Sequence, residues 1–213
     1  SEISNGEPDN KKVMVVSADC TGHGVPGAIM SVIGINLLHE AAREEITAPK
    51  LILEQMNNGV QQILKQGSTD NRDGMDMAVL VVDRKRNLVR FSGANNPLVY
   101  VQGDKIHQIK GDKKPIGSYA RNDGQGFSQH EIQITEPTWF YMFSDGYADQ
   151  FGGRAKRKFM AKNLRNLLQE ISIRPAEEQK NILNLVIEAW RDDDKQIDDI
   201  SIVGLKIYPS KIA

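Results

Sequence analysis

Two patterns of apolar residues divide the chain. Short apolar runs between turn-forming residues predict strands, and apolar residues spaced three or four positions apart predict helices. The runs predict strands at 13–18, 77–83, 88–93, 128–134, 138–144 and 200–207, and a hairpin over 98–110 that turns at Gly103-Asp104. Helical spacing predicts helices at 26–44, from about 47 to 63, around 164–171 and from 175 to 190. The order of strands, two helices, strands, two helices and a strand predicts an α+β domain with helix pairs packed on sheets.

The helix predicted over 26–44 has an apolar face that we expect to be buried. Pro26 suits the first turn of a helix, where its missing N–H costs nothing. The predicted face consists of Ile29, Ile33, Leu37 and Ala41, widened by Met30, Val32 and Leu38.

Acidic residues follow three of the apolar runs. Asp19 lies in SADCTGHGVPGA (17–28), Asp145 lies in FYMFSDGYADQFGG (140–153), and Asp198-Asp199 precede ISIVGLKI (200–207). A carboxylate buried at a strand end needs a hydrogen-bond network or a cation. Three such acids, far apart in sequence, therefore suggest one site for a hard divalent metal, and an all-oxygen ligand set favours Mg²⁺ or Mn²⁺. Two-metal sites of this kind serve phosphoryl transfer.

Each of these residues also has a simpler interpretation. An Asp-Gly pair after an apolar run is usually only a turn, and Asp192-Asp193-Asp194 are expected to form a solvated loop. His23 is consistent with two roles, a general acid near metal ions or an ordinary loop residue. Cys20 suits a small buried residue whose backbone carbonyl can still bind a metal. Asn95-Asn96 suit either a substrate contact or a tight turn.

Composition narrows the class of protein. The 213 residues suffice for one domain, and the formal net charge of −1 argues against nucleic-acid binding. The single cysteine excludes an intrachain disulfide and is consistent with a reducing compartment. We find no apolar run of the length needed to span a membrane and no signal peptide. We therefore expect a cytoplasmic chain.

Five motifs together resemble the metal-dependent protein phosphatase (PPM) family, in its bacterial SpoIIE-type branch. They are DCTGHGVPGA at 19–28, GANNPLVY at 93–100, KPIG at 114–117, FSDGYADQFGG at 143–153 and DDISIV at 198–203. The resemblance implies a central antiparallel β-sandwich flanked by helix pairs, in αββα layers, with a binuclear Mn²⁺/Mg²⁺ centre at one edge. It also implies hydrolysis of phosphoserine and phosphothreonine in proteins, without a covalent phospho-enzyme.

The resemblance also implies residue roles. Asp19 corresponds to the bridging metal ligand and Cys20 to the residue that gives a backbone oxygen. Asp145 and Asp198 correspond to the remaining ligands, and Asp199 lies where related enzymes often have Asn or Asp. His23 is a candidate proton donor to the leaving group. The helix pair over 26–66 corresponds to the pair that can control metal binding and through which members of the branch form homodimers.

The resemblance is incomplete at the N-terminal side. The family normally has a further acid in a GDFYD- or GDFYW-like strand upstream of Ser1, and we identify no counterpart of the phosphate-binding arginine or the third-metal acid. We expect residues 1–213 to be a single SpoIIE-type phosphatase domain that lacks its first strand. The resemblance further implies that this domain is the cytoplasmic output domain of a longer regulator, which in some cases is anchored in a membrane. It also implies that the substrates are small phosphoserine proteins of the anti-sigma-antagonist (STAS) type.

Two other functions remain open from the sequence. A pseudo-phosphatase that docks a phosphoprotein without turnover is favoured by the missing acid and opposed by the retention of Asp19, Asp145 and Asp198. A two-metal phosphoesterase for nucleotides or small molecules is opposed by the near-neutral charge and by the absence of a nucleotide-binding fingerprint.

Overall fold

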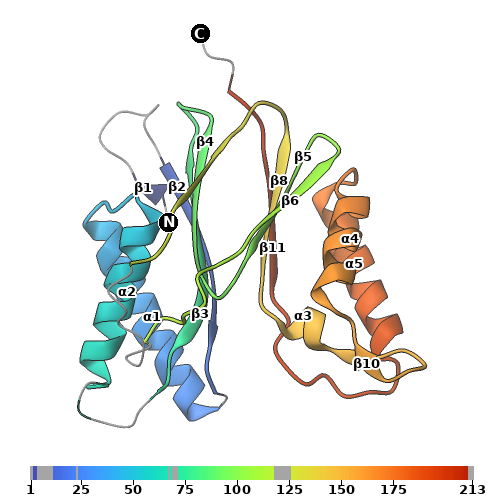
Figure 1. Cartoon of the computed structure of the whole chain (residues 1–213), viewed down its shortest axis with the longest axis horizontal. Helices are drawn as coiled ribbons and strands as arrows, with labels where there is room; N and C mark the ends of the chain where they lie inside the picture. The colour runs from blue at the N-terminus through green and yellow to red at the C-terminus, as the bar shows by residue number, and fades with distance from the viewer. Residues whose placement is uncertain are drawn as a thin grey trace. The chain divides into compact units, whose positions relative to one another are not determined.

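The structure is a computed structural model that describes residues 2–3, 12–22, 24–66, 68, 72–117 and 126–210 (Figure 1). Its contacts divide the chain into two compact units. Unit 1 comprises Ser1–Leu98, Lys110–Thr135 and Pro209–Ala213, and unit 2 comprises Val99–Ile109 and Glu136–Tyr208. Each unit contains one main sheet and its own helices, so they are described in turn.

Unit 1 is an antiparallel sheet covered by a pair of helices. The strand order is β1 (Glu2–Ile3), β2 (Lys12–Cys20), β3 (Met75–Asp83), β4 (Leu88–Ala94) and β7 (His130–Gln133). The helices are α1 (Val25–Arg43) and α2 (Pro49–Ile63). The central strand β3 is buried along nearly its whole length, as its continuous apolar sequence requires. Met77 and Val79 of this strand pack with Leu53, Met56 and Val60 of α2 in the core.

Helix α1 buries only part of the face that was predicted. Met30, Leu37 and Ala41 are buried in the core of unit 1, but Ile29 and Val32, both expected to face inward, are 54% and 59% exposed. The predicted face was wrong at these two positions because α1 is apolar nearly all round, so spacing alone does not select the inner side. The sequence analysis found no apolar run long enough to span a membrane, but α1 meets that requirement by length and composition, although its inner face packs in the core.

Unit 2 contains a second sheet in the order β11 (Ile202–Ile207), β8 (Thr138–Phe143), β5 (Leu98–Gln102) and β6 (Lys105–Ile109). Strands β8 and β11 are antiparallel. Helices α4 (Ala161–Ile171) and α5 (Ala176–Arg191) pack on this sheet through Leu164, Leu168, Leu183 and Ile187. The short helix α3 (Gly146–Asp149) and the hairpin β9 (Phe151–Gly152) and β10 (Arg157–Lys158) lie between β8 and α4 in the chain.

The predicted class, with antiparallel sheets and helix pairs, is confirmed. The boundaries of the long helices and of most strands agree with the predictions within about two residues. The prediction omitted α3 and the β9–β10 hairpin, because elements of two to four residues are too short to show a period. Among the described residues of 111–126, no regular helix or strand occurs, as expected from the density of helix- and strand-breaking residues.

Candidate active site

In unit 1, Asp19 faces a second aspartate across the sheet. Asp19 is the penultimate residue of β2 and pairs in register with Asp76 of β3. The Nδ2 group of Asn95 donates a 2.7 Å hydrogen bond to Oδ1 of Asp76. Directly opposed residues in an antiparallel pair have Cβ atoms about 5 Å apart. Unit 1 therefore presents two carboxylates at one end of the sheet, one of them held by an amide side chain.

The turn after Asp19 is fastened to the start of β3. The N–H of Thr21 donates to the carbonyl oxygen of Gly74 at 2.9 Å, and the N–H of Gly74 donates to Oγ1 of Thr21 at 2.8 Å. Gly22 has a φ of +82°, which favours glycine. A Cβ added at Gly27, in the first turn of α1, would lie 2.7 Å from the Gly22 carbonyl oxygen. The glycines of this motif thus allow the Asp19 turn to lie against α1.

The KPIG and GANNP motifs support this end of unit 1 through backbone contacts. Met75 and Ile116 exchange backbone hydrogen bonds of 3.0 and 2.8 Å, and a Cβ at Gly74 would lie 2.2 Å from the Ile116 carbonyl oxygen. Asn95 has a φ of +58°, and the N–H of Asn96 donates to the Ala94 carbonyl oxygen. The tight-turn interpretation of these asparagines therefore holds, with the addition that Asn95 orients Asp76.

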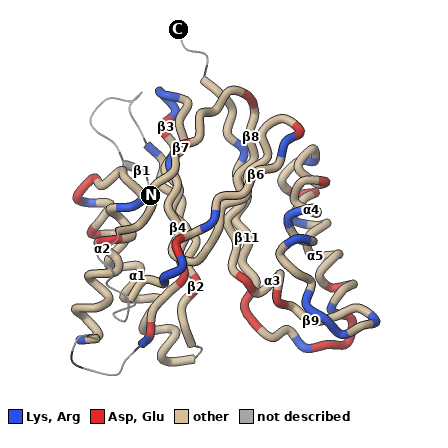
Figure 2. Tube along the Cα trace, viewed as in Figure 1, with Lys and Arg blue, Asp and Glu red and all other residues tan. Residues whose placement is uncertain are grey.

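In unit 2, two acidic segments more than fifty residues apart in sequence are in contact. Asp145 precedes α3, and Asp198-Asp199 precede β11. The Oγ of Ser144 donates a 3.0 Å hydrogen bond to the Asp199 carbonyl oxygen, and a Cβ at Gly146 would lie 2.3 Å from that same oxygen. Only glycine permits this approach of the two backbones. Figure 2 shows the resulting concentration of acidic residues near α3 and the start of β11.

The surroundings of Asp145 are those of an acid that lacks a sufficient counter-charge. Removal of water by neighbouring atoms raises the pKa of Asp145, and the carboxylates of Asp198 and Asp149 raise it further, while Lys158 lowers it. Lys158 instead forms a 2.7 Å ion pair with Asp149. Clustered carboxylates with oxygen donors suit a hard cation such as Mg²⁺ or Mn²⁺, which would relieve this repulsion.

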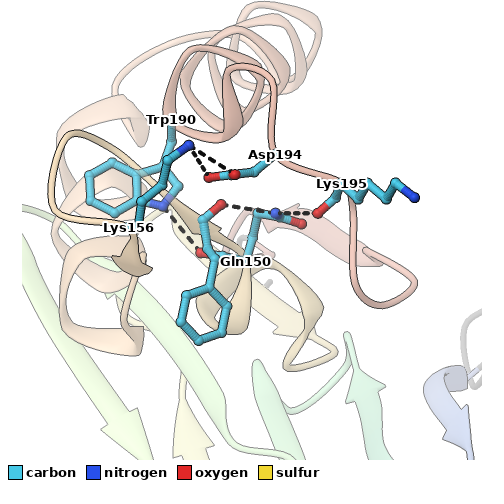
Figure 3. A network of polar contacts seen from close by, with 6 residues as sticks. Gln150, Lys156, Trp190, Asp194 and Lys195 are labelled. Atoms are coloured by element: carbon cyan, nitrogen blue, oxygen red, sulfur yellow. Dashed lines mark hydrogen bonds and ion pairs between the residues drawn. The ribbon is translucent and has the colours of Figure 1, made fainter.

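A polar network fixes the loop that leads to Asp198 (Figure 3). The Nε2 group of buried Gln150 donates to the carbonyl oxygens of Phe151 and Lys195, both at 3.0 Å. The indole N–H of Trp190 donates to the Gln150 carbonyl oxygen at 3.1 Å, and Lys156 pairs with Asp194 at 2.9 Å. These contacts tie the end of α5 and residues 194–195 to the β9–β10 hairpin, which limits the positions open to Asp198.

The sequence-predicted site residues are divided between the two units. Asp145, Asp198 and Asp199 lie together in unit 2, and Asp19 and Cys20 lie at the end of β2 in unit 1. His23 lies outside the described residues. The expectation that the acids are buried was wrong: Asp19 is half-buried, and Asp145, Asp198 and Asp199 are exposed. Within the described ranges, no group of three or more His, Cys, Asp or Glu side chains is placed to hold one metal ion.

Sequence reasoning missed Asp76. Its position inside the strand MDMAVLVVD gave it no turn signal of the kind that marked Asp19 and Asp145. The position of Asp76 between the apolar residues Met75 and Met77 of β3 was the one signal in the sequence. That Asp76 lies opposite Asp19 follows only from the register of β2 and β3.

An antiparallel sheet with a helix pair in each unit matches the fold of solved PP2C-type phosphatase domains. The family model for SpoIIE, Stage II sporulation protein E, matches residues 9–208, so the chain belongs to this family. A comparison with curated protein sequences finds no match.

Three solved structures illustrate the similarity. The SiaA-PP2C domain of Pseudomonas aeruginosa is 26% identical with a TM-score of 0.80, over 95% of this chain and 78% of that one. The RsbU and RsbW domains of Rv1364c from Mycobacterium tuberculosis are 19% identical with a TM-score of 0.69, over 95% of this chain and 55% of that one. RsbX in complex with magnesium is 14% identical with a TM-score of 0.63, over 97% and 86% of the respective chains.

Proposed function

We propose that this SpoIIE-family phosphatase domain is a Mn²⁺- or Mg²⁺-dependent protein serine/threonine phosphatase that acts on a phosphoserine regulatory protein in bacterial signalling. The observation that carries the proposal is the contact between the Asp145 and Asp198-Asp199 segments, where acids repel one another in the absence of a cation. A metal site is the simplest reason to hold such carboxylates together, because their repulsion is a cost to the fold without one.

The proposed ligands follow the family resemblance. By that resemblance, the residues that would hold the ions are Asp19, Cys20 through its backbone oxygen, Asp145, Asp198 and Asp199. RsbX, a similar structure, was solved with magnesium, which supports this choice of ion. When bound, such ions lower the pKa of water and neutralise charge that develops on the phosphoryl group.

The proposed reaction is a direct displacement at phosphorus. An oxygen of water forms the new bond to phosphorus, the bond from phosphorus to the serine Oγ breaks, and the serine oxygen takes up a proton. His23 is the proposed donor of that proton. The products are inorganic phosphate and the unmodified serine.

The proposed substrate is a small STAS-type protein that carries phosphoserine. The similar chain that contains RsbU and RsbW domains supports a role among regulatory partner proteins. The net charge of −1 supplies no strong field to select a partner, so recognition would depend on local contacts.

A homodimer through α1 is the second part of the proposal. Val25, Ile29, Val32 and Ile35 form an exposed apolar stripe on α1, and a groove lined by Met14, Val16 and Leu38 runs beside it. Contiguous exposed apolar surface of this kind marks an interaction site. A second copy fits because a two-fold axis brings the same stripe to itself. In solution, Val32→Glu should convert the dimer to a monomer, whereas Leu185→Glu, at an exposed position of α5, should not.

The test of the enzymatic proposal is a Mn²⁺ titration with two substrates. Turnover of p-nitrophenyl phosphate reports the metal chemistry, and a phosphoserine STAS protein reports the substrate class. Asp145→Asn and Asp19→Asn should each abolish Mn²⁺-dependent turnover, while Asp193→Asn, in the exposed loop after α5, should leave it unchanged.

The outcomes separate the alternatives. Full activity in Asp145→Asn would refute the metal-site assignment. If the wild type binds the phosphoprotein but turns over neither substrate at any Mn²⁺ concentration, the chain is a docking module instead. Rapid hydrolysis of nucleotides, with none of the phosphoprotein, would favour a small-molecule phosphoesterase.

A further inference from the structure

The loop between α5 and β11, residues 192–201, carries Asp198 and is held at two points by the segment that carries Asp145. The first point lies before Asp198. There the Nε2 group of Gln150 donates a 3.0 Å hydrogen bond to the carbonyl oxygen of Lys195 (Figure 3). Gln150 is fully buried, whereas Lys195 is exposed. A buried side chain thus reaches a loop that is 45 residues away in sequence.

The second point lies after Asp198. The Oγ of Ser144 donates to the carbonyl oxygen of Asp199 and accepts a hydrogen bond from the N–H of Ser201, both at 3.0 Å. The N–H of Ser144 also donates to the carbonyl oxygen of Ser201 at 3.0 Å. The loop is therefore fastened on both sides of Asp198, in each case by a residue that flanks Asp145 in the chain.

The amide of Gln150 does more than fill space. Its Nε2 group donates to two carbonyl oxygens, those of Phe151 and Lys195, while its Oε1 makes no hydrogen bond within the described part of the chain. A buried amide oxygen without a donor is costly, and an apolar side chain of the same size would avoid that cost. Such a side chain would leave the Lys195 carbonyl oxygen without this donor. The contact with the loop is therefore the reason to have an amide here.

Gln150 donates from a rigid base. Its own carbonyl oxygen accepts hydrogen bonds from the indole N–H of Trp190 at 3.1 Å and from the N–H of Phe159 at 2.9 Å. The rings of Trp190 and Phe159 pack edge to face, with 5.4 Å between their centres. The N–H of Gly153 donates to the Trp190 carbonyl oxygen at 2.8 Å, and Gly152 lies so close to that oxygen that no side chain fits. The β9–β10 hairpin and the end of α5 therefore hold Gln150 in one place.

We propose that Gln150 and Ser144 are positioning residues that set the separation of Asp145 and Asp198, and thereby the affinity of these acids for a divalent cation. The inference rests on the proposed function, because it assigns both carboxylates to one metal site. Carboxylates that repel one another move apart unless the backbone holds them. A site whose ligands are already held in place binds its cation more tightly. Both residues act through the backbone of the loop, and neither is a proposed ligand.

Mn²⁺ binding tests the proposal directly. Electron paramagnetic resonance of free Mn²⁺, in a titration of the metal-free full chain, gives the dissociation constant without any turnover. Gln150→Met keeps the length of the side chain and removes the donor. It should raise the dissociation constant about tenfold, the lower end of the range for groups that orient metal ligands. Ser144→Ala should raise it by a similar factor, and it decides the matter if Gln150→Met does not fold.

Unit 2 offers a matched control for each variant. Gln179 is also buried and donates its Nε2 to a backbone carbonyl oxygen, that of Arg174 at 2.9 Å, but it lies in the first turns of α5, at the other end of the helix from the loop. Buried Ser172 donates its Oγ to the carbonyl oxygen of Gln169 at 2.7 Å. Gln179→Met and Ser172→Ala should lower the urea midpoint in EDTA but leave the Mn²⁺ dissociation constant unchanged.

A second measurement reports the loop without any metal. Trypsin cleaves after lysine, and Lys195 is exposed but held through its carbonyl oxygen. In EDTA, Gln150→Met should be cleaved after Lys195 about fivefold faster than the wild type, because local opening no longer breaks this hydrogen bond. Gln179→Met should be cleaved there at the wild-type rate.

The outcomes separate this inference from the proposed function. Equal Mn²⁺ dissociation constants in wild type and Gln150→Met would overturn the positioning role and leave the proposed function standing. An equal loss of affinity in Gln150→Met and Gln179→Met would also overturn it, because the cause would then be a general loss of stability. Unchanged cleavage after Lys195 in Gln150→Met would refute the tether. A wild type that binds no Mn²⁺ would overturn the proposed function and this inference together.

Discussion

Exchange of the Asp76–Asn95 pair tests whether the acid beside Asp19 serves the metal or only the fold. In Asn95→Asp, the 2.7 Å hydrogen bond is replaced by two opposed carboxylates. At this solvent-accessible position, the lost bond contributes about 1 kcal/mol. Two like charges about 4 Å apart add roughly 1 kcal/mol of repulsion at the dielectric constant of water. The free energy of unfolding should therefore fall by about 2 kcal/mol.

Urea unfolding in EDTA measures this change. With a slope of about 2 kcal/mol per molar urea, the midpoint should fall by about 1 M. Asn95→Gly keeps the positive φ of +58° and loses only the bond, so its midpoint should fall by about half as much. The double variant Asp76→Asn/Asn95→Asp restores one amide–carboxylate pair, and its midpoint should return close to that of the wild type.

The double variant then separates stability from metal binding. Its net charge is that of the wild type, but its carboxylate has moved from β3, opposite Asp19, to the turn after β4. If Asp76 helps to bind the metal, the double variant should need several times more Mn²⁺ while unfolding normally. A wild-type Mn²⁺ requirement in this variant would refute a role for Asp76 in the site. An Asn95→Asp midpoint equal to that of the wild type would refute the pairing itself.

Three further predictions concern Gly146, Asp145 and Leu53. Gly146→Ala should abolish Mn²⁺-dependent turnover, because its Cβ would lie 2.3 Å from the Asp199 carbonyl oxygen, and an unaltered rate would contradict this contact. Because the pKa of Asp145 is raised in the folded state, its ionisation destabilises the fold as pH rises through that pKa. At pH 7 without metal, Asp145→Asn should therefore unfold at a higher urea concentration than the wild type. This difference in midpoint should disappear at pH values below the ordinary aspartate pKa. Leu53→Ala, in the core of unit 1, should lower the free energy of unfolding by about 2–5 kcal/mol and raise the Mn²⁺ half-saturation more than it changes the maximal rate. Equal Mn²⁺ half-saturation in wild type and Leu53→Ala would contradict control of metal binding by the α1–α2 helix pair.

The elements that could be predicted from sequence are those whose periodicity reflects burial on one side. Strand β8, which is buried throughout, was predicted nearly to its boundaries. Helix α4 was predicted from the shared face of Leu164, Leu168 and Ile171, and it begins three residues earlier, at Ala161. Helix α1 shows the limit of the method. Its outer face carries Ile29 and Val32 where a surface helix would carry polar residues, so the sequence did not separate these two residues from Met30 and Leu37, which are buried.

The candidate site shows a related limit. Asp19, Asp145 and Asp198 were identified because each stands between an apolar run and a turn, a local signal. Asp76 carries no such signal, since its significance depends on the register that sets it opposite Asp19. The exposure of Asp145 and Asp198 was likewise beyond sequence reasoning, because the neighbours that shield a side chain come from distant segments.

The glycines of the motifs allow close packing of the backbone and contribute no chemical group to the site. Gly146 lies against the Asp199 carbonyl oxygen, and Gly74 lies against that of Ile116, each at a distance that no side chain permits. These contacts are needed for the fold whether or not a metal binds. A relative that had lost its activity would therefore be expected to keep them. The motif match thus supports the fold more strongly than it supports turnover. The acids discriminate better, since partial burial and the carboxylate of Asp198 raise the pKa of Asp145, and a protein without a metal would gain stability by replacing Asp145. Their retention in this chain is the stronger physical reason to expect an enzyme.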